Sequence, residues 1–217
     1  IAFEAFRAVP EGYVNSFIDK KDNYEILTYY STTLDSVDKP DFTLGYKNIQ
    51  GTNFEILILK DKLTKLHSSK NEIKSYLEYL TDNGQIVLSQ ILTVESTRLS
   101  TLIKDEEIKE IVLELEDRVF TNSANELINW NYKEVITYLE ENNFIDIEYN
   151  ILKLSDVRVI TENNITTWFN SEMGKALIDT GYDNRKKEIV TYLNKNLSNK
   201  EFNWISKHLI ISGKRKL

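Results

Sequence analysis

The sequence predicts an α/β fold in which a mostly parallel sheet is covered by helices on both faces. Residues 54–90 carry the pattern of a strand, a helix, a glycine and a second strand, which is a βαβ unit. Residues 13–34 carry the pattern of a strand, an acidic residue and a helix. Units of this kind form parallel sheets with right-handed crossovers. A final apolar strand, 207–212, is expected to be antiparallel to the rest.

The N-terminal segments alternate between helix and strand. Residues 3–9 resemble the last turns of a helix, and 13–18 are a short apolar strand that ends at Asp19. Apolar residues at helical spacing predict a helix over 24–34, and 41–46 form a weaker strand. The order strand, acidic residue, helix, strand follows from these patterns.

The βαβ unit has the clearest periodicity. Four consecutive apolar residues after Glu55 predict that 54–59 is a strand buried on both faces. An amphipathic helix follows, beginning near Ser69 or Asn71, and its inward residues are Ile73, Tyr76, Leu77 and Leu80. Gly84 is predicted to end this helix, and 85–90 resumes as a buried strand.

In the second half of the sequence, helical segments precede and follow a predicted strand. Residues 104–120 form a helix with an exposed acidic face made of Glu106, Glu107, Glu110, Glu114 and Glu116. Asn131 is expected to cap the next helix, with Glu134 completing a capping box. Residues 145–151 alternate apolar and polar side chains, which is typical of an edge or antiparallel strand. Further helices are predicted at 165–169 and 184–197, so one domain over 1–217 carries helical insertions at about 104–142 and 161–200.

Composition excludes several classes of protein. No apolar run approaches the roughly 20 residues that span a bilayer, so no membrane segment is expected. The chain has no cysteine, which favours a cytoplasmic location and leaves no familiar zinc site. Its net charge of -7 argues against a strong direct nucleic-acid surface, and the short basic runs 185–187 and 214–216 are expected to be solvated. The chain contains no G-x-S-x-G elbow, so nothing in the sequence indicates a serine hydrolase.

Several phrases of the chain resemble a known domain. They are the segments 4–12, 95–102, 128–131, 143–144 and 165–169, which read EAFRAVPEG, ESTRLSTL, INWN, NF and ITTWF. Together they resemble the methyltransferase-like, Rossmann-type domain fused C-terminal to RarA/MgsA-type AAA ATPases, which maintain recombination and replication. The resemblance covers nearly the whole chain, although none of its motifs is catalytic.

This resemblance implies a cofactor and one of its ligands. In such folds a glycine-rich turn after the first strand approaches the cofactor, and an acidic residue that ends the second strand binds ribose hydroxyls. Asp19 would be that acid, S-adenosylmethionine the cofactor, and the first strand with its glycine-rich loop would precede Ile1. The chain itself contains no G-x-G and no P-loop spacing. Asp19 could instead be a helix cap or turn residue.

Two further site candidates follow from their positions in the chain. Lys60 and Asp61 come directly after the strongest strand and would face the crevice at the carboxyl end of the sheet as cofactor-binding residues, or form an ordinary exposed loop pair. Enzymes that methylate the amino groups of DNA bases have an Asp/Asn-Pro-Pro-aromatic turn there, whereas this strand exits as Leu59-Lys-Asp-Lys62, which disfavours that class. Arg98 could bind the carboxylate or phosphate of a substrate, or it could pin its own loop.

Two functions are compatible with these residues. No side chain has an identifiable catalytic role, which favours a non-catalytic or degenerate methyltransferase-like module that serves a AAA ATPase, in cis or in trans, in DNA maintenance. The alternative is an S-adenosylmethionine-dependent methyltransferase of unknown substrate, because methyl transfer depends mostly on positioning and leaves little trace in a sequence.

Overall fold

The computed structural model describes residues 2–9, 12–33, 39–48, 53–63, 73–122, 128 and 131–216. Its contacts divide the chain into two compact units, residues 1–53 and 54–217, and each is described by itself. The expectation of a single domain over 1–217 stays a prediction.

The first unit alternates helices and strands as predicted. Its elements are α1 (Ala2–Ala8), β1 (Asn15–Ile18), α2 (Lys21–Thr32), β2 (Asp41–Leu44) and the short 3-10 helix η1 (Tyr46–Asn48). β1 and β2 are parallel, with Ile18 opposite Leu44. The rings of Phe3 and Phe42 lie 5.7 Å apart, so α1 packs on β2. The second helix begins at Lys21, earlier than the apolar spacing from Tyr24 predicted, because its first turn is polar and solvent-exposed.

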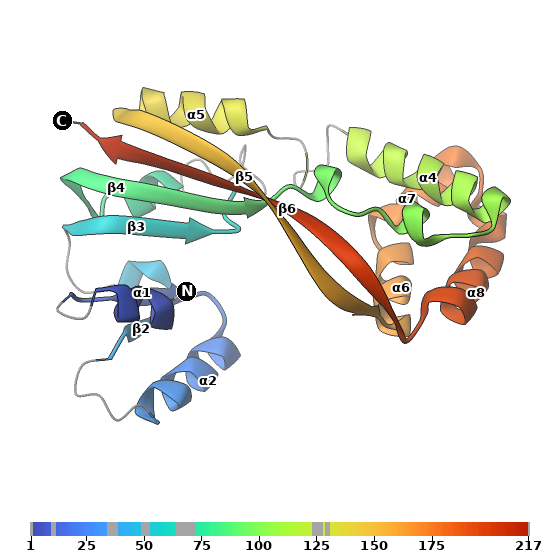
Figure 1. Cartoon of the computed structure of the whole chain (residues 1–217), viewed down its shortest axis with the longest axis horizontal. Helices are drawn as coiled ribbons and strands as arrows, with labels where there is room; N and C mark the ends of the chain where they lie inside the picture. The colour runs from blue at the N-terminus through green and yellow to red at the C-terminus, as the bar shows by residue number, and fades with distance from the viewer. Residues whose placement is uncertain are drawn as a thin grey trace. The chain divides into compact units, whose positions relative to one another are not determined.

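The second unit contains a four-stranded sheet (Figure 1). Its strands are β3 (Phe54–Lys60), β4 (Leu80–Ile91), β5 (Phe144–Ile160) and β6 (Lys200–Arg215), in the order β3-β4-β6-β5. β3 and β4 are parallel, whereas β6 is antiparallel to both of its neighbours. The α/β class, the parallel βαβ pair, the antiparallel C-terminal strand and the edge position of β5 are therefore confirmed.

One face of this sheet is apolar and buried. Ile86 and Leu88 of β4 lie opposite Gly213 and Ile211 of β6, and all four are buried. Burial of β3 on both faces was predicted wrongly, because Ile56 and Ile58 are 52% and 40% exposed. A run of apolar residues cannot distinguish a strand that is covered twice from one that is covered once.

The helix between β3 and β4 ends earlier than its periodicity predicted. Residues 73–77 are helical, the predicted start near Ser69 or Asn71 lies outside the described residues, and Leu80 already belongs to β4. Gly84 lies inside β4 and does not cap the helix. Arg215 of β6 instead donates from Nη1 to the carbonyls of Leu77 and Leu80, at 3.0 Å each. A cation from a distant strand thus satisfies the carbonyl of the last helical residue.

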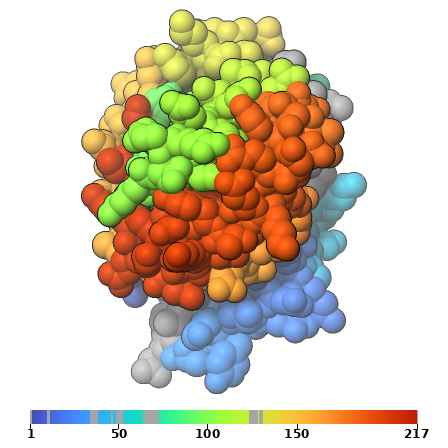
Figure 2. Space-filling view, turned by 90° about the vertical axis from the view of Figure 1, so that its right-hand side faces the viewer, coloured from blue at the N-terminus to red at the C-terminus, as the bar shows by residue number. Residues whose placement is uncertain are grey.

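The strands β5 and β6 continue beyond the sheet as a two-stranded ribbon, which leads to a group of helices that we call the helical lobe (Figure 1). The lobe comprises η3 (Leu99–Leu102), α4 (Glu106–Thr121), α6 (Glu162–Phe169), α7 (Glu172–Thr180) and α8 (Lys186–Leu197). Its core includes Val112, Leu115, Ile165, Phe169 and Leu193. Figure 2 shows α4 in green against the orange and red atoms of the later helices. α7 has no counterpart among the helices predicted from the sequence.

Helix caps fix the starts of several of these elements. Asn131 accepts hydrogen bonds from the backbone N–H groups of Lys133 and Glu134 at the start of α5 (Tyr132–Glu141), which confirms the predicted cap. The amide of Asn131 also donates to Glu134 at 2.8 Å. α5 lies along β5 in Figure 1, with Val135 and Leu139 fully buried.

Candidate functional site

Asp19 lies at the carboxyl end of the parallel pair β1 and β2. It follows Ile18, whose carbonyl accepts a hydrogen bond from Gly45 at 2.9 Å, and its own side chain is exposed. The N-cap residue of α2 is Lys20, so Asp19 precedes the cap position and does not occupy it. Ligands of open α/β sheets bind outside the carboxyl ends of the strands. The position of Asp19 is therefore the one expected for a ribose-binding carboxylate.

Lys60 and Asp61 lie at the carboxyl end of the other parallel pair, β3 and β4. Lys60 is the last residue of β3 and pairs with Ser89, whose carbonyl accepts a 2.8 Å hydrogen bond from the N–H of Asp61. Asp61 has φ of 55°, a left-handed conformation that Asp adopts more readily than most residues. Both side chains are exposed. Both residues therefore lie at the edge of the sheet where they were expected.

A buried glutamine fixes the loop that carries this pair. Gln90 of β4 is 3% exposed, and its Oε1 accepts a 3.0 Å hydrogen bond from the N–H of Leu63. A buried amide without such a partner would cost stability, so this bond holds the loop against β4. Gln90 was not among the site residues predicted from the sequence, although a polar residue in the apolar run of β4 was a readable signal.

Arg98 lies far along the chain from these residues, at the start of the helical lobe. Its guanidinium pairs with Asp117 of α4 and lies 5.0 Å from the ring centre of Phe120. The N–H groups of Leu99 and Ser100 donate to Glu116 at 2.7 and 3.2 Å. These contacts favour the reading in which Arg98 pins its own loop, while substrate binding by Arg98 stays a prediction.

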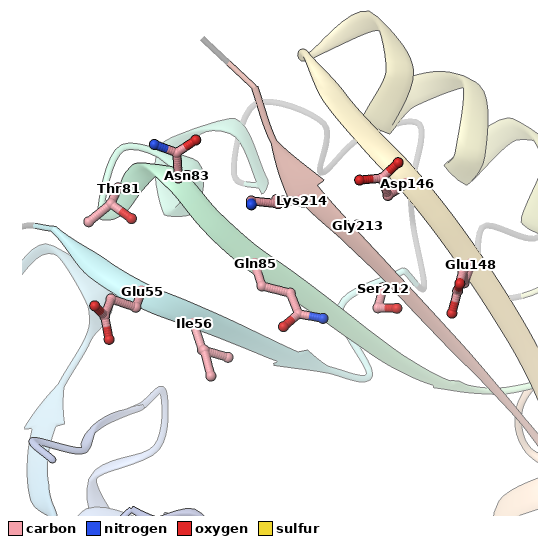
Figure 3. Close-up of a pocket in the computed structure, with 10 residues that line it drawn as sticks. All are labelled: Glu55, Ile56, Thr81, Asn83, Gln85, Asp146, Glu148, Ser212, Gly213 and Lys214. Carbon is pink, nitrogen blue, oxygen red and sulfur yellow. The ribbon is translucent and has the colours of Figure 1, made fainter. Parts of the chain in front are cut away.

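A hollow of the sheet lies toward the opposite end of β3 and β4 (Figure 3). It has a volume of about 570 Å³ and opens on the face that carries Ile56. Its lining residues are Glu55, Ile56, Thr81, Asn83, Gln85, Asp146, Glu148, Ser212, Gly213 and Lys214. Glu55 and Gln85 precede the carboxyl ends of their strands by several residues, so this hollow is separate from the edge that bears Lys60 and Asp61.

The described residues contain neither a candidate metal cluster nor a helix that could span a membrane. No group of His, Asp and Glu side chains there could hold a metal ion. In the same residues, no helix has the length and apolar character needed to cross a membrane. His67, one of the two histidines of the chain, lies outside the described residues, and His208 lies in β6.

The chain matches no protein-family model and no curated protein. It is similar to solved structures of methyltransferases. A candidate methyltransferase from Bacillus halodurans is 10% identical, with a TM-score of 0.53 over 100% of this chain and 89% of that one. The YcgJ protein of Bacillus subtilis is 14% identical, with a TM-score of 0.50 over 94% and 83% of the two chains.

A third similar structure carries a ligand. Phosphoethanolamine N-methyltransferase 2 of Haemonchus contortus, solved with phosphomonomethylethanolamine and S-adenosylhomocysteine, is 10% identical, with a TM-score of 0.50 over 98% of this chain and 46% of that one. At such identities the likeness concerns the fold. The chain therefore has the Rossmann-like fold of methyltransferases.

Proposed function

We propose that this protein is an S-adenosylmethionine-dependent methyltransferase of unspecified substrate. The observation that carries the proposal is the exposed carboxylate of Asp19 at the end of β1, next to the parallel strand β2, in a chain with the methyltransferase fold. This reading is preferred to the non-catalytic module, because the similar structures include methyltransferases and one of them holds S-adenosylhomocysteine.

The described residues fit a nucleoside-type cofactor by their chemistry. A carboxylate accepts hydrogen bonds from two vicinal ribose hydroxyls, and Asp19 is exposed and precedes the cap position of α2. S-adenosylmethionine, when bound, supplies an activated methyl group. The residues of the chain would then act mainly by holding the two reactants in line.

The glycine-rich turn of such enzymes has no counterpart in the sequence, and we propose that it lies upstream of Ile1. Its backbone would approach the cofactor at the point where a side chain would collide. Sequencing the natural gene upstream of Ile1 tests this proposal directly. A strand followed by G-x-G supports it, and any other upstream sequence contradicts it.

Calorimetric titration with S-adenosylmethionine tests the proposed function. We expect saturable binding to the complete natural protein and a loss of about 10- to 100-fold in affinity for Asp19→Ala, because charge-assisted hydrogen bonds contribute roughly 1.5–3 kcal/mol. The melting temperature should not change, since Asp19 is exposed.

Asp22→Ala is the matched control. Asp22 is an exposed carboxylate in the first turn of α2, close to Asp19 in the chain, and its loss should leave the affinity unchanged. Equal losses in both variants would remove Asp19 from the site. An intact fold with no heat of binding would contradict the enzyme and favour the module that serves a AAA ATPase. A pull-down with the ATPase subunit would then test that partner.

A further inference from the structure

The chain leaves β3 through a short segment whose backbone conformation is unusual. We call residues 60–63 the β3 turn, and within it Asp61 has φ of 55°. A left-handed backbone is strained for a residue with a β carbon, and it persists only where the surrounding contacts enforce it. Neighbouring parts of the protein must therefore hold the β3 turn in its conformation.

Strand β4 holds the β3 turn through two hydrogen bonds. The N–H of Asp61 donates to the carbonyl of Ser89 at 2.8 Å, which continues the parallel pairing of β3 with β4 through backbone atoms alone. The N–H of Leu63 donates to the side-chain Oε1 of Gln90 at 3.0 Å. The second bond depends on the identity of residue 90, because only a side chain with an acceptor at that reach can make it.

The β3 turn has one buried end and one exposed end. Leu63 and Gln90 are 2% and 3% exposed, so water does not readily replace the bond between them. Lys62 lies between the two ends, with its Nζ 5.8 Å from the ring centre of the buried Tyr76. Lys60 is exposed at the other end. The contact at the buried end therefore determines where the exposed end lies.

Packing alone would favour an apolar residue at position 90. Side chains alternate along a strand, so Ile86 and Leu88 share a face of β4 with Gln90, and both are buried. A polar side chain costs free energy among such neighbours unless it is hydrogen-bonded. The bond to Leu63 is thus the feature that accounts for a glutamine in this strand.

We propose that Gln90 is a positioning residue for S-adenosylmethionine, because it holds the β3 turn in the conformation that contacts the cofactor. The inference rests on the proposed function, since ligands of open α/β sheets bind outside the carboxyl ends of the strands and the β3 turn lies at that end of β3. Gln90 is buried and acts through the turn. A turn that is ordered before binding spares the ligand the cost of ordering it.

Gln90→Met tests the inference, because methionine has a similar size and lacks the acceptor. Calorimetric titration of the complete natural protein with S-adenosylmethionine should show an affinity about tenfold lower for this variant. A turn that is correctly ordered for about a tenth of the time lowers the apparent affinity by that factor. Hydrogen exchange at the N–H of Leu63 should become faster at the same time, with or without ligand.

Two further variants separate positioning from general stability. Gln90→Glu keeps an acceptor oxygen at the same reach, so it should recover most of the affinity although a buried carboxyl group lowers the melting temperature. Leu88→Ala leaves a cavity in the same face of β4 without removing a bond to the turn, so it should lower the melting temperature and keep the affinity. If Gln90 served stability alone, the affinity would follow the melting temperature in all three variants.

The outcomes distinguish this inference from the proposed function. A folded wild-type protein that does not bind S-adenosylmethionine would overturn both. Binding by the wild type that Gln90→Met leaves unchanged would overturn the inference alone, as would an equal loss of affinity in Leu88→Ala or no recovery in Gln90→Glu. If Gln90→Met fails to fold, Gln90→Asn replaces it, because its amide is one methylene too short to reach Leu63, and an unchanged affinity would again contradict the inference.

Discussion

Glu116 on α4 accepts hydrogen bonds from two backbone N–H groups, those of Leu99 and Ser100, and is 5% exposed. The sequence placed it on a solvated acidic face with Glu110 and Glu114, and that assignment was wrong. The helical period does not reveal that the segment before α4 folds back over this part of the helix. The carboxylate of Glu116, which the sequence pattern places at the surface, therefore joins η3 to α4 through hydrogen bonds.

Burial raises the pKa of Glu116 above its usual value of 4.5, although hydrogen bonds from Ser100 and Leu99 and the charge of Arg98 act in the opposite direction. The folded state therefore holds the proton to a higher pH than the unfolded state. The contribution of this group to the free energy of unfolding is greatest at low pH and declines as pH rises through the folded pKa.

We expect Glu116→Gln to remove this part of the pH dependence. At pH 7 it should also lower the free energy of unfolding by roughly 1–3 kcal/mol, because an amide can accept one of the two N–H bonds and leaves the other unpaired. Urea unfolding between pH 4 and 8 measures both effects. The exposed Glu110→Gln on the same helix is the control, and identical pH profiles for the wild type and Glu116→Gln would contradict the argument.

At the scale of elements, β4 shows how tertiary contacts override a local signal. A β carbon at position 84 would lie 2.6 Å from side-chain atoms of Leu80 and 2.9 Å from the hydroxyl of Thr81. The glycine is therefore required by packing within the strand. The helix before it ends at Leu77, and Arg215 donates hydrogen bonds to the carbonyl groups of Leu77 and Leu80, an interaction that no local pattern contains.

Gly84→Ala should destabilise the protein by about 1–3 kcal/mol, the usual cost of overpacking a well-packed site. Leu80→Ala should destabilise it as well, because Leu80 is buried. In the Leu80→Ala background the alanine at 84 should cost less, since the two closest colliding atoms are gone and the Thr81 hydroxyl remains. A double-mutant cycle of unfolding free energies measures this coupling, and additive effects would show that the two side chains do not interact.

At the scale of the whole second unit, the helical lobe and the sheet have separate cores that the β5–β6 ribbon connects. The lobe core combines residues from α4 with residues from α6, α7 and α8, which lie on the two sides of β5 in the sequence. The ribbon between the cores is exposed along residues 152–159 of β5. Regions joined by so few buried contacts can open independently.

Ile165→Ala should therefore destabilise the lobe by about 2–5 kcal/mol, the cost of a cavity in a core where Ile165 is fully buried. Hydrogen exchange should show faster exchange in α4, α6 and α8 and unchanged protection in β3 and β4. Ile178→Ala, at an exposed site of the same lobe, should change neither. Uniform loss of protection across the unit would mean that both cores unfold together.

The candidate site was partly predictable for a physical reason. Asp19, Lys60 and Asp61 follow strands directly, and the carboxyl end of a parallel strand is a defined place in an α/β fold, so position in the chain is enough to propose them. Arg98 and Gln90 differ, because the contacts that define their roles come from α4 and from the loop after β3. Those partners lie far away in the sequence.

The sequence by itself determined the parallel βαβ pair, the edge or antiparallel placement of β5 and the cap at Asn131, because each depends on spacing within a few residues. Only the tertiary structure decided that β3 is buried on one face, that Gly84 belongs to a strand and that Glu116 is buried. These features depend on which distant segment covers a residue, and local periodicity carries no information about that.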